Sequence, residues 1–197
     1  PGPGEISLAH HGVLFLDELA EFRRETLEIL RQPMEEHCVK LARLAGNYEF
    51  PSDFMLVAAM NPCRCGYYPD LNRCHCTKGM VEQYLKKISQ PLLDRIDICV
   101  ETKRVEYQDL IKENPHQETS AEIRKRVVAA MERQQQRFAG TNIRYNSRIP
   151  AALLTKYCRL STKQKQYMES IYQKLELTAR SYHRILRVAR TIADMDG

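Results

Sequence analysis

The chain has 197 residues, of which 43% are hydrophobic and 28% charged, a composition typical of a globular protein with a sizeable core. No apolar run approaches the roughly 18 residues that cross a bilayer, and no signal peptide opens the chain, so we expect a cytoplasmic protein with no membrane partner. The formal net charge of +5 is uneven: residues 1–104 carry 13 basic and 15 acidic side chains, whereas residues 105–197 carry 17 and 10. A basic second half indicates contact with phosphate, although scattered charges on solvated helices give the same count.

Three short apolar runs in the first half have the pattern of buried strands. Residues 13–17 (VLFLD) and 54–60 (FMLVAAM) are nearly continuous in apolar side chains, as strands covered on both faces are. Residues 97–102 (DICVET) form a third such run. These runs predict a buried sheet.

A helix and a hairpin are predicted between the first two runs. Residues 25–36 have helical spacing, with their large apolar side chains on one face and charges on the other. Residues 38–51 alternate apolar and polar side chains around Gly46-Asn47, which is typical of a hairpin.

The second half has helical periodicity almost throughout. Thr119 or Ser120 could cap the first helix after the polar break at 113–120, and Pro150 could open a further short helix. The longer helical segments are residues 121–138, 162–175 and 179–195. The sequence therefore predicts an α/β domain over 1–104, a linker over 105–118 and an all-α domain over 119–197.

Two adjacent carboxylates, which we call the acidic pair (Asp17 and Glu18), end the first run, and Asn61 follows the second. The carboxyl ends of parallel strands open onto the ligand crevice of an α/β sheet. Asp17 could hold Mg²⁺ there beside nucleotide phosphates, and Glu18 could orient or deprotonate the attacking water. Asn61 could contact a γ-phosphate or fix that water without adding charge. A strand that surfaces at a polar turn and an Asn-Pro turn are the plainer explanations.

Arg95 stands between an amphipathic helix at residues 80–88 and the third apolar run. An arginine so placed can project toward a neighbouring subunit's phosphates and stabilise the charge that develops on them. The alternative is a surface salt bridge to Asp94 or Asp97.

Four of the seven cysteines lie within fourteen residues, as two Cys-x-Cys pairs eight residues apart. The four are Cys63, Cys65, Cys74 and Cys76. Four thiolates can enclose a tetrahedral Zn²⁺ in a closed, structural site, with His75 as a substitute ligand. Because the usual spacing within a pair is two to four residues, a loop of unligated cysteines stays open as the alternative.

Four motifs in chain order resemble the AAA+ ATPases of the magnesium-chelatase-like branch, and more closely its ComM/YifB group. The motifs are GVLFLDE at 12–18, AAMNP at 58–62, LLDRIDI at 92–98 and SYHRILRVARTIAD at 181–194. The resemblance covers essentially the whole chain. It implies a partial P-loop-type α/β core with an incomplete parallel sheet, followed by a helical lid domain.

The resemblance also implies a role for each candidate residue. The acidic pair matches the Walker B motif, in which Asp17 positions Mg²⁺ and Glu18 activates water, and Asn61 matches sensor 1. Arg95 matches the arginine finger that acts in trans. Arg180 matches the sensor-2 arginine, which reaches from the lid to the nucleotide phosphate.

One family motif is absent, since no G-x-x-x-x-G-K-[ST] occurs in these residues. The backbone N–H groups and the lysine of that loop make most of the contacts to the nucleotide phosphates. We therefore expect the loop to belong to an amino-terminal part outside this sequence, and these residues alone to hydrolyse nothing. Because the strand of that loop would also be missing, we expect residues 97–102 to pair between copies or to be loosely held.

The resemblance implies a homo-oligomeric ring, a hexamer, that uses ATP and Mg²⁺ to remodel DNA, as in competence and branch migration. The hairpin over 38–51 matches an insertion that faces the central pore in this branch, with Lys40 and Arg43 as candidates for contact with nucleic acid. Two alternatives stay open. One is a magnesium-chelatase motor subunit acting in tetrapyrrole metal insertion, and the other is a non-enzymatic binding module stapled by zinc.

Overall fold

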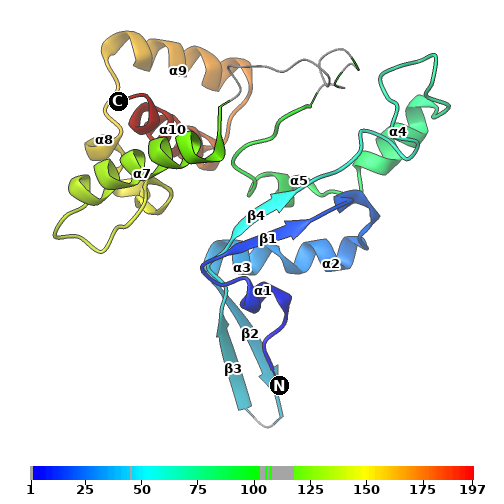
Figure 1. Ribbon diagram of the computed structural model, residues 1–197, viewed down its shortest axis with the longest axis horizontal. Coiled ribbons are helices and arrows are strands. Elements are labelled where there is room, and N and C mark those ends of the chain that lie inside the picture. Colours follow the sequence, from blue (N-terminus) through cyan, green and yellow to red (C-terminus); the bar gives the residue numbers. More distant parts are fainter. Residues whose placement is uncertain (1, 45, 103–104, 106, 108–117) are drawn as a thin grey trace. The chain divides into compact units, whose positions relative to one another are not determined.

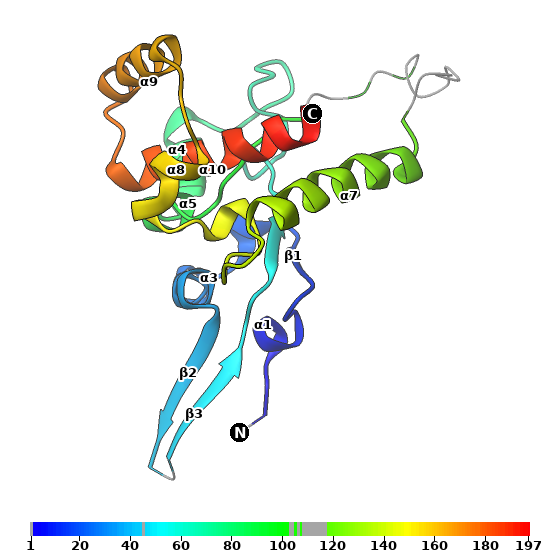
Figure 2. The same ribbon diagram turned by 90° about the vertical axis from the view of Figure 1, so that its left-hand side faces the viewer.

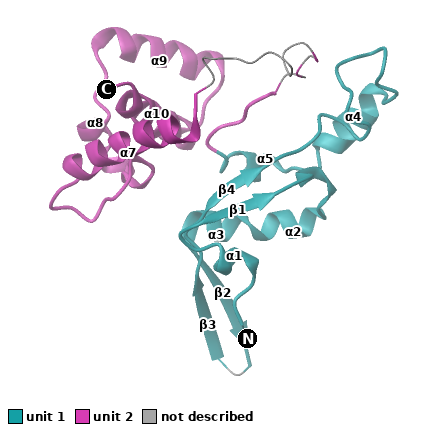
Figure 3. Ribbon diagram, viewed as in Figure 1, with its two compact units in different colours: residues 1–96 teal, residues 97–197 magenta. Residues whose placement is uncertain are grey.

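The computed structural model describes residues 2–44, 46–102, 105, 107 and 118–197. The chain divides into two compact units, residues 1–96 (unit 1) and residues 97–197 (unit 2), each with its own hydrophobic core (Figure 3). Unit 1 is mixed α/β, and the secondary structure described in unit 2 is helical. The prediction of an α/β part with an incomplete parallel sheet, followed by an all-α part, is confirmed. No helix among the described residues is long and apolar enough to cross a membrane.

Unit 1 is built on two parallel strands. Strands β1 (Val13–Leu16) and β4 (Met55–Ala58) pair in register from Val13↔Met55 to Leu16↔Ala58 (Figure 1). The short helices of the described part of this unit are α1 (Glu5–Leu8), α2 (Arg24–Ile29), α3 (Arg31–Glu36), α4 (Lys78–Leu85) and α5 (Gln90–Leu93). A 3₁₀ turn, η1 (Leu19–Glu21), follows β1.

One face of the β1–β4 pair packs on the core, and the other is open. Leu14 and Leu16 lie against the buried cluster of unit 1. That cluster contains Leu19, Ala20, Leu27, Leu30, Tyr84, Ile88 and Leu92. On the opposite face Val13 is 52% exposed, Phe15 58% and Met55 60%. The prediction that both faces are covered is therefore wrong for the described residues, since these supply nothing over the outer face.

The predicted hairpin is confirmed. Strands β2 (Cys38–Arg43) and β3 (Gly46–Pro51) pair antiparallel, and the ribbon projects away from the rest of unit 1 in both views (Figures 1 and 2). Arg43 pairs with Gly46, so the strands turn two residues earlier than the predicted Gly46-Asn47. Gly46 begins the return strand. Its φ of 137° is a conformation that glycine adopts without steric cost.

The third predicted strand does not form. Residues 97–102 contain no strand, and Ile98 and Val100 are 64% and 77% exposed. A strand is stable only where a neighbour pairs its backbone N–H and C=O groups, and the described part of the chain offers none. The expectation that this run pairs between copies or is loosely held stays a prediction.

The described part of unit 2 contains three longer helices with side-chain N-caps and three short helical segments without them. Its elements are α7 (Ser120–Arg137), η2 (Asn146–Arg148), η3 (Ala151–Leu153), α8 (Leu154–Tyr157), α9 (Thr162–Lys174) and α10 (Ala179–Asp196). Thr119 caps α7: its hydroxyl accepts from the Glu122 N–H, and the Glu122 carboxylate accepts from the Thr119 N–H. The core contains Phe138, Ile149, Leu154, Cys158 and Leu186.

Candidate nucleotide site and metal centre

The carboxyl ends of β1 and β4 lie side by side, and the candidate residues follow them. The ladder continues past β4, because the Ala59 N–H donates to Leu16 O at 3.0 Å and Ala59 O accepts from the Leu19 N–H at 2.9 Å. The acidic pair and Asn61 therefore leave the sheet at the same end, and all three side chains are exposed. We call these residues the strand-end site. The structure places them together as the sequence predicts, and their catalytic roles stay a prediction.

Glu18 has an unusual backbone conformation. Its φ of 49° and ψ of 47° lie in the left-handed region, and its N–H donates to Asp17 Oδ1 at 2.9 Å. The next two residues, Leu19 and Ala20, are buried and fix the chain behind it. A left-handed conformation is costly for a residue with a Cβ, and such conformations cluster at functional sites. The observation supports a functional role for this position.

Arg95 follows α5 and folds back onto its own unit. Its side chain is 10% exposed, pairs with Glu35 Oε2 at 2.5 Å and donates to Pro91 O at 2.5 Å. Burial lowers the pKa of this guanidinium, and the charge of Arg31 lowers it further. The sequence suggested a salt bridge to a neighbouring aspartate, whereas Glu35 lies sixty positions away and carries no local signal.

Arg180 lies near the start of α10 in unit 2 and is exposed. Two other arginines of that helix have structural partners. Arg187 donates to Ile149 O at 3.0 and 2.8 Å, and Arg190 pairs with Asp194 at 2.7 Å. The structure therefore assigns these two arginines to the packing of unit 2. The role of Arg180 at a nucleotide stays a prediction.

Sequence reasoning missed a buried polar network in unit 2, which we call the Asp194 network (Arg137, Asn146, Arg190 and Asp194). Asp194 is 0% exposed, and its carboxylate accepts hydrogen bonds from Nη1 and Nη2 of Arg137. It also accepts from Asn146 Nδ2 at 2.8 Å and from Arg190 Nη2 at 2.7 Å. The network joins α7, η2 and α10. Its members lie up to 57 positions apart, so no local sequence pattern predicts the network.

The charge state of Asp194 follows from these contacts. Burial alone raises the pKa of a carboxyl group, but the hydrogen bonds from Arg137, Asn146 and Arg190 outweigh it and lower the pKa of Asp194 to about 2. The carboxylate is therefore ionised in the folded protein at neutral pH. A buried charge with this set of donors is a stabilising element rather than a reactive group.

The four cysteines of the Cys-rich segment converge on one point. We call them the four-cysteine cluster (Cys63, Cys65, Cys74 and Cys76), and all four Sγ atoms lie within 4.8 Å of one another. The Sγ separations are 3.4 Å for Cys63–Cys65, 3.8 Å for Cys63–Cys74 and 3.5 Å for Cys65–Cys74. A disulfide needs about 2.05 Å, so these are not disulfides. Four sulfurs each about 2.3 Å from a tetrahedral Zn²⁺ would stand about 3.8 Å apart, so the cluster has the right size for that ion.

Neighbouring groups move the pKa values of the four thiols in opposite directions, lowering those of Cys63 and Cys65 and raising those of Cys74 and Cys76. A backbone hydrogen bond from Tyr67 is the main cause that lowers the pKa of Cys65 to about 6. The pKa of Cys74 is raised to about 12: a backbone hydrogen bond from Cys76 lowers it, but burial and the sulfurs of Cys65 and Cys63 together outweigh that effect. His75 is exposed and stands outside the converging group.

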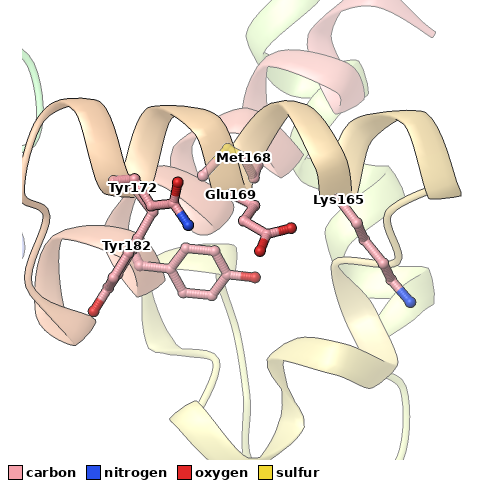
Figure 4. Close-up of a pocket in the computed structure, with 6 residues that line it drawn as sticks. Lys165, Met168, Glu169, Tyr172 and Tyr182 are labelled. Carbon is pink, nitrogen blue, oxygen red and sulfur yellow. The ribbon is translucent and has the colours of Figure 1, made fainter.

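An open pocket of about 430 Å³ lies between α9 and α10 of unit 2 (Figure 4). It is lined by Lys165, Met168, Glu169, Tyr172, Gln173 and Tyr182. The rings of Tyr172 and Tyr182 meet edge to face with centroids 6.1 Å apart. None of the predicted site residues lines this pocket, so it takes no part in the chemistry that the sequence predicts.

Comparison with protein families gives the class to which the chain belongs. The family model described as magnesium chelatase, subunit ChlI, matches residues 1–110, and the model of the C-terminal region of that subunit matches residues 117–197. The chain therefore belongs to the magnesium chelatase subunit ChlI family, within the AAA+ proteins, as the motifs indicated.

The similar individual proteins are bacterial. The chain is 42% identical over 196 residues to the uncharacterized protein YifB of Escherichia coli K12, and 41% identical over 196 residues to YifB of Salmonella typhimurium. It is 41% identical over 197 residues to the competence protein ComM of Haemophilus influenzae. Each match covers 100% of this chain and 38% of the relative, so the chain spans less than half the length of these curated relatives.

Proposed function

We propose that these residues form the later part of an ATPase site in a ring-forming AAA+ motor that acts on DNA. The observation that carries the proposal is the strand-end site: a carboxylate pair and a neutral amide leave two paired parallel strands at the same end. The left-handed backbone at Glu18 supports it, because such strain is retained where a side chain must be aimed. The phosphate-binding loop would be supplied by residues outside these 197.

Each residue of the site would have one task. Asp17 would hold the Mg²⁺ that neutralises the ATP phosphates, with Glu18 activating the attacking water and Asn61 aligning it. Arg95 would act on the nucleotide of a neighbouring copy, which requires a homo-oligomeric ring, such as a hexamer. Arg180 would couple hydrolysis to movement of the helical unit. Bound Mg²⁺ would supply charge neutralisation, and the residues named here orient water and phosphate.

DNA is the substrate that best fits the chain. The similar protein of Haemophilus influenzae is named a competence protein. The β2–β3 hairpin projects from unit 1, its tip residue Leu44 is fully exposed, and Lys40 and Arg43 lie on the same hairpin. A projecting ribbon with basic side chains can contact a phosphate backbone.

The test is ATP turnover by the full-length protein with and without DNA. Glu18→Gln should lower turnover by about 100- to 10,000-fold while ATP binding is kept, because the variant loses the base and not the phosphate contacts. Glu25→Gln, an exposed glutamate on α2, is the matched control and should retain activity. A wild-type protein that hydrolyses no ATP, or a Glu18→Gln variant with full turnover, would refute the proposal. Stimulation by a porphyrin instead of DNA would favour a magnesium-chelatase motor.

We also propose that the four-cysteine cluster binds one structural Zn²⁺. The convergence of four sulfurs at separations close to those of a tetrahedral site supports this. Metal analysis of full-length protein purified without added zinc should give about one ion per chain. A content far below one would refute the metal and favour unligated cysteines.

A further inference from the structure

The Cys loop (residues 63–76) begins immediately beside the strand-end site. Only Pro62, whose φ is fixed by its ring, separates Asn61 from Cys63. Cys63 is 0% exposed and is the buried member of the four-cysteine cluster. Whatever fixes the Cys63 sulfur therefore also fixes the backbone from which the Asn61 side chain projects.

The loop also passes beside Asn61. The Gly66 N–H donates to Cys63 O at 3.0 Å, and Gly66 has a φ of 81°. A Cβ added at Gly66 would lie 3.8 Å from Asn61 Oδ1 and 3.9 Å from its Cγ, in ordinary van der Waals contact. The Gly66 backbone therefore lies next to the Asn61 carboxamide, separated from it by about the room that a methyl group would fill.

Apart from the converging sulfurs, the contacts within this loop are local, such as the Arg73 guanidinium over the Tyr67 ring at 4.2 Å. Residues 63–76 contain no helix or strand, and their backbone hydrogen bonds join near neighbours, such as the Asp70 N–H to Tyr67 O at 2.8 Å. Leu71 is 81% exposed, so it adds nothing to a core. A segment of this length without apolar burial needs a covalent or metal staple to keep one conformation.

From these contacts we propose that metal binding by the four-cysteine cluster positions Asn61, so that the metal-loaded loop is required for turnover and not for nucleotide binding. The inference rests on the proposed function of the strand-end site, and it makes the position of the Asn61 carboxamide depend on the conformation of the Cys loop beside it. Cys63, Cys65, Cys74 and Cys76 are positioning residues in this scheme, because they act through Asn61 and touch no substrate.

The first experiment removes the metal without touching the residues next to Asn61. In the full-length protein, Cys74→Ser combined with Cys76→Ser should abolish metal binding and speed hydrogen exchange at residues 58–66, while α2 exchanges as before. kcat should fall about 100-fold, the scale of losing one preorganised hydrogen-bonding group, with KM within about twofold. Cys99→Ser, an exposed cysteine outside the cluster, is the matched control and should change none of these readouts.

The second experiment tests whether the cysteines act through Asn61. Adding the two cysteine substitutions to Asn61→Ala should lower kcat no further than Asn61→Ala alone, because residues that act as a unit are not additive. A further loss close to the product of the separate effects would overturn the inference.

A third variant keeps all four metal ligands. Gly66→Ala should retain about one metal ion per chain yet lower kcat about tenfold, because alanine is disfavoured by roughly that factor in a left-handed conformation. Gly79→Ala is the control, since a Cβ there meets nothing within 4 Å and the residue is helical.

Loss of metal in the double cysteine variant with unchanged kcat and unchanged hydrogen exchange at residues 58–66 would overturn the inference. If wild-type protein hydrolyses no ATP but exchange at 58–66 still depends on metal, the proposed function fails and the positioning of Asn61 stands.

Discussion

The strand-end site of unit 1 and the Asp194 network of unit 2 contain the same kinds of side chain in opposite settings. In unit 2 the Asp194 carboxylate is fully buried, and Arg137, Asn146 and Arg190 donate to it. In unit 1 the carboxylates and the amide of the strand-end site are exposed at the ends of two strands. In the Asp194 network the protein itself supplies the hydrogen-bond donors that the carboxylate needs. The side chains of the strand-end site are accessible to a ligand.

The difference teaches how to separate structural from functional polar residues. A buried charge without partners would cost several kcal/mol, so a buried carboxylate surrounded by donors is explained by folding alone. The exposed acidic pair has no desolvation cost to offset, and the left-handed backbone of Glu18 adds strain of the kind that functional sites retain. Burial, rather than residue type, distinguishes the two sets.

Arg95 stands between the two classes and gives the largest expected effect. It is nearly buried and paired with Glu35, like the arginines of unit 2, yet its motif matches an arginine finger. If it acts in trans, Arg95→Ala should lower ATP turnover of the full-length protein by about 1,000-fold or more. Glu35→Gln removes the ion pair alone and should cost far less activity. Equal losses in the two variants would place Arg95 with the structural arginines.

The next effect is on stability. Asp194→Ala removes the buried acceptor of two partly buried arginines and of Asn146, and should lower the free energy of unfolding of unit 2 by about 3–5 kcal/mol. Asp196→Ala, an exposed aspartate of the same helix, is the matched control. Hydrogen exchange of α7 and α10 measures the change. A loss below that of the control would show that the network contributes nothing net.

Much of the fold and part of the candidate site follow from local patterns. The apolar runs at β1 and β4, the hairpin and the Thr119 cap are each encoded within a few residues, and all four form. The four-cysteine cluster follows the same rule, because two tight pairs joined by a loop need only a short closure to meet. Chain order along parallel strands was enough to place the strand-end site at one edge.

What could not be predicted depends on contacts between distant residues. The partner of Arg95 is sixty positions away, and Asp194 meets Arg137 across 57 positions. The predicted strand at 97–102 has strand-forming residues but no neighbour to pair with among the residues described, so its propensity is not realised. Propensity and periodicity report on single segments, and these outcomes depend on which segments meet.

The buried carboxylate of unit 2 should make the free energy of unfolding depend on pH. The pKa of Asp194 is about 2 in the folded protein, below its ordinary 3.8, so the folded state binds fewer protons than the unfolded chain in this range. Its contribution of about 2 kcal/mol is complete above pH about 5 and is lost as the pH falls from there toward 2. The Thr119 cap lowers the pKa of Glu122, so this residue changes the stability in the same direction. The free energy of unfolding is therefore measured against pH for wild type and for Asp194→Asn, and the difference between the two curves isolates the contribution of Asp194. Identical pH profiles for the two proteins would contradict the assignment.

The smallest effect tests whether the strand-end site stores strain that the Asp194 network does not. Glu18 occupies a left-handed conformation that costs a residue with a Cβ about 1–2 kcal/mol and glycine almost nothing. Glu18→Gly should therefore raise the free energy of unfolding of unit 1 by about 1 kcal/mol, part of the relief being offset by the greater freedom of glycine in the unfolded chain. Glu18→Gln keeps the Cβ and should leave stability unchanged, although both variants lose turnover. Thermal unfolding of the full-length protein, compared across the two variants, measures the difference. A Glu18→Gly protein no more stable than Glu18→Gln would mean that the backbone at the strand end is unstrained, and the argument from conformation to function at this position would fail.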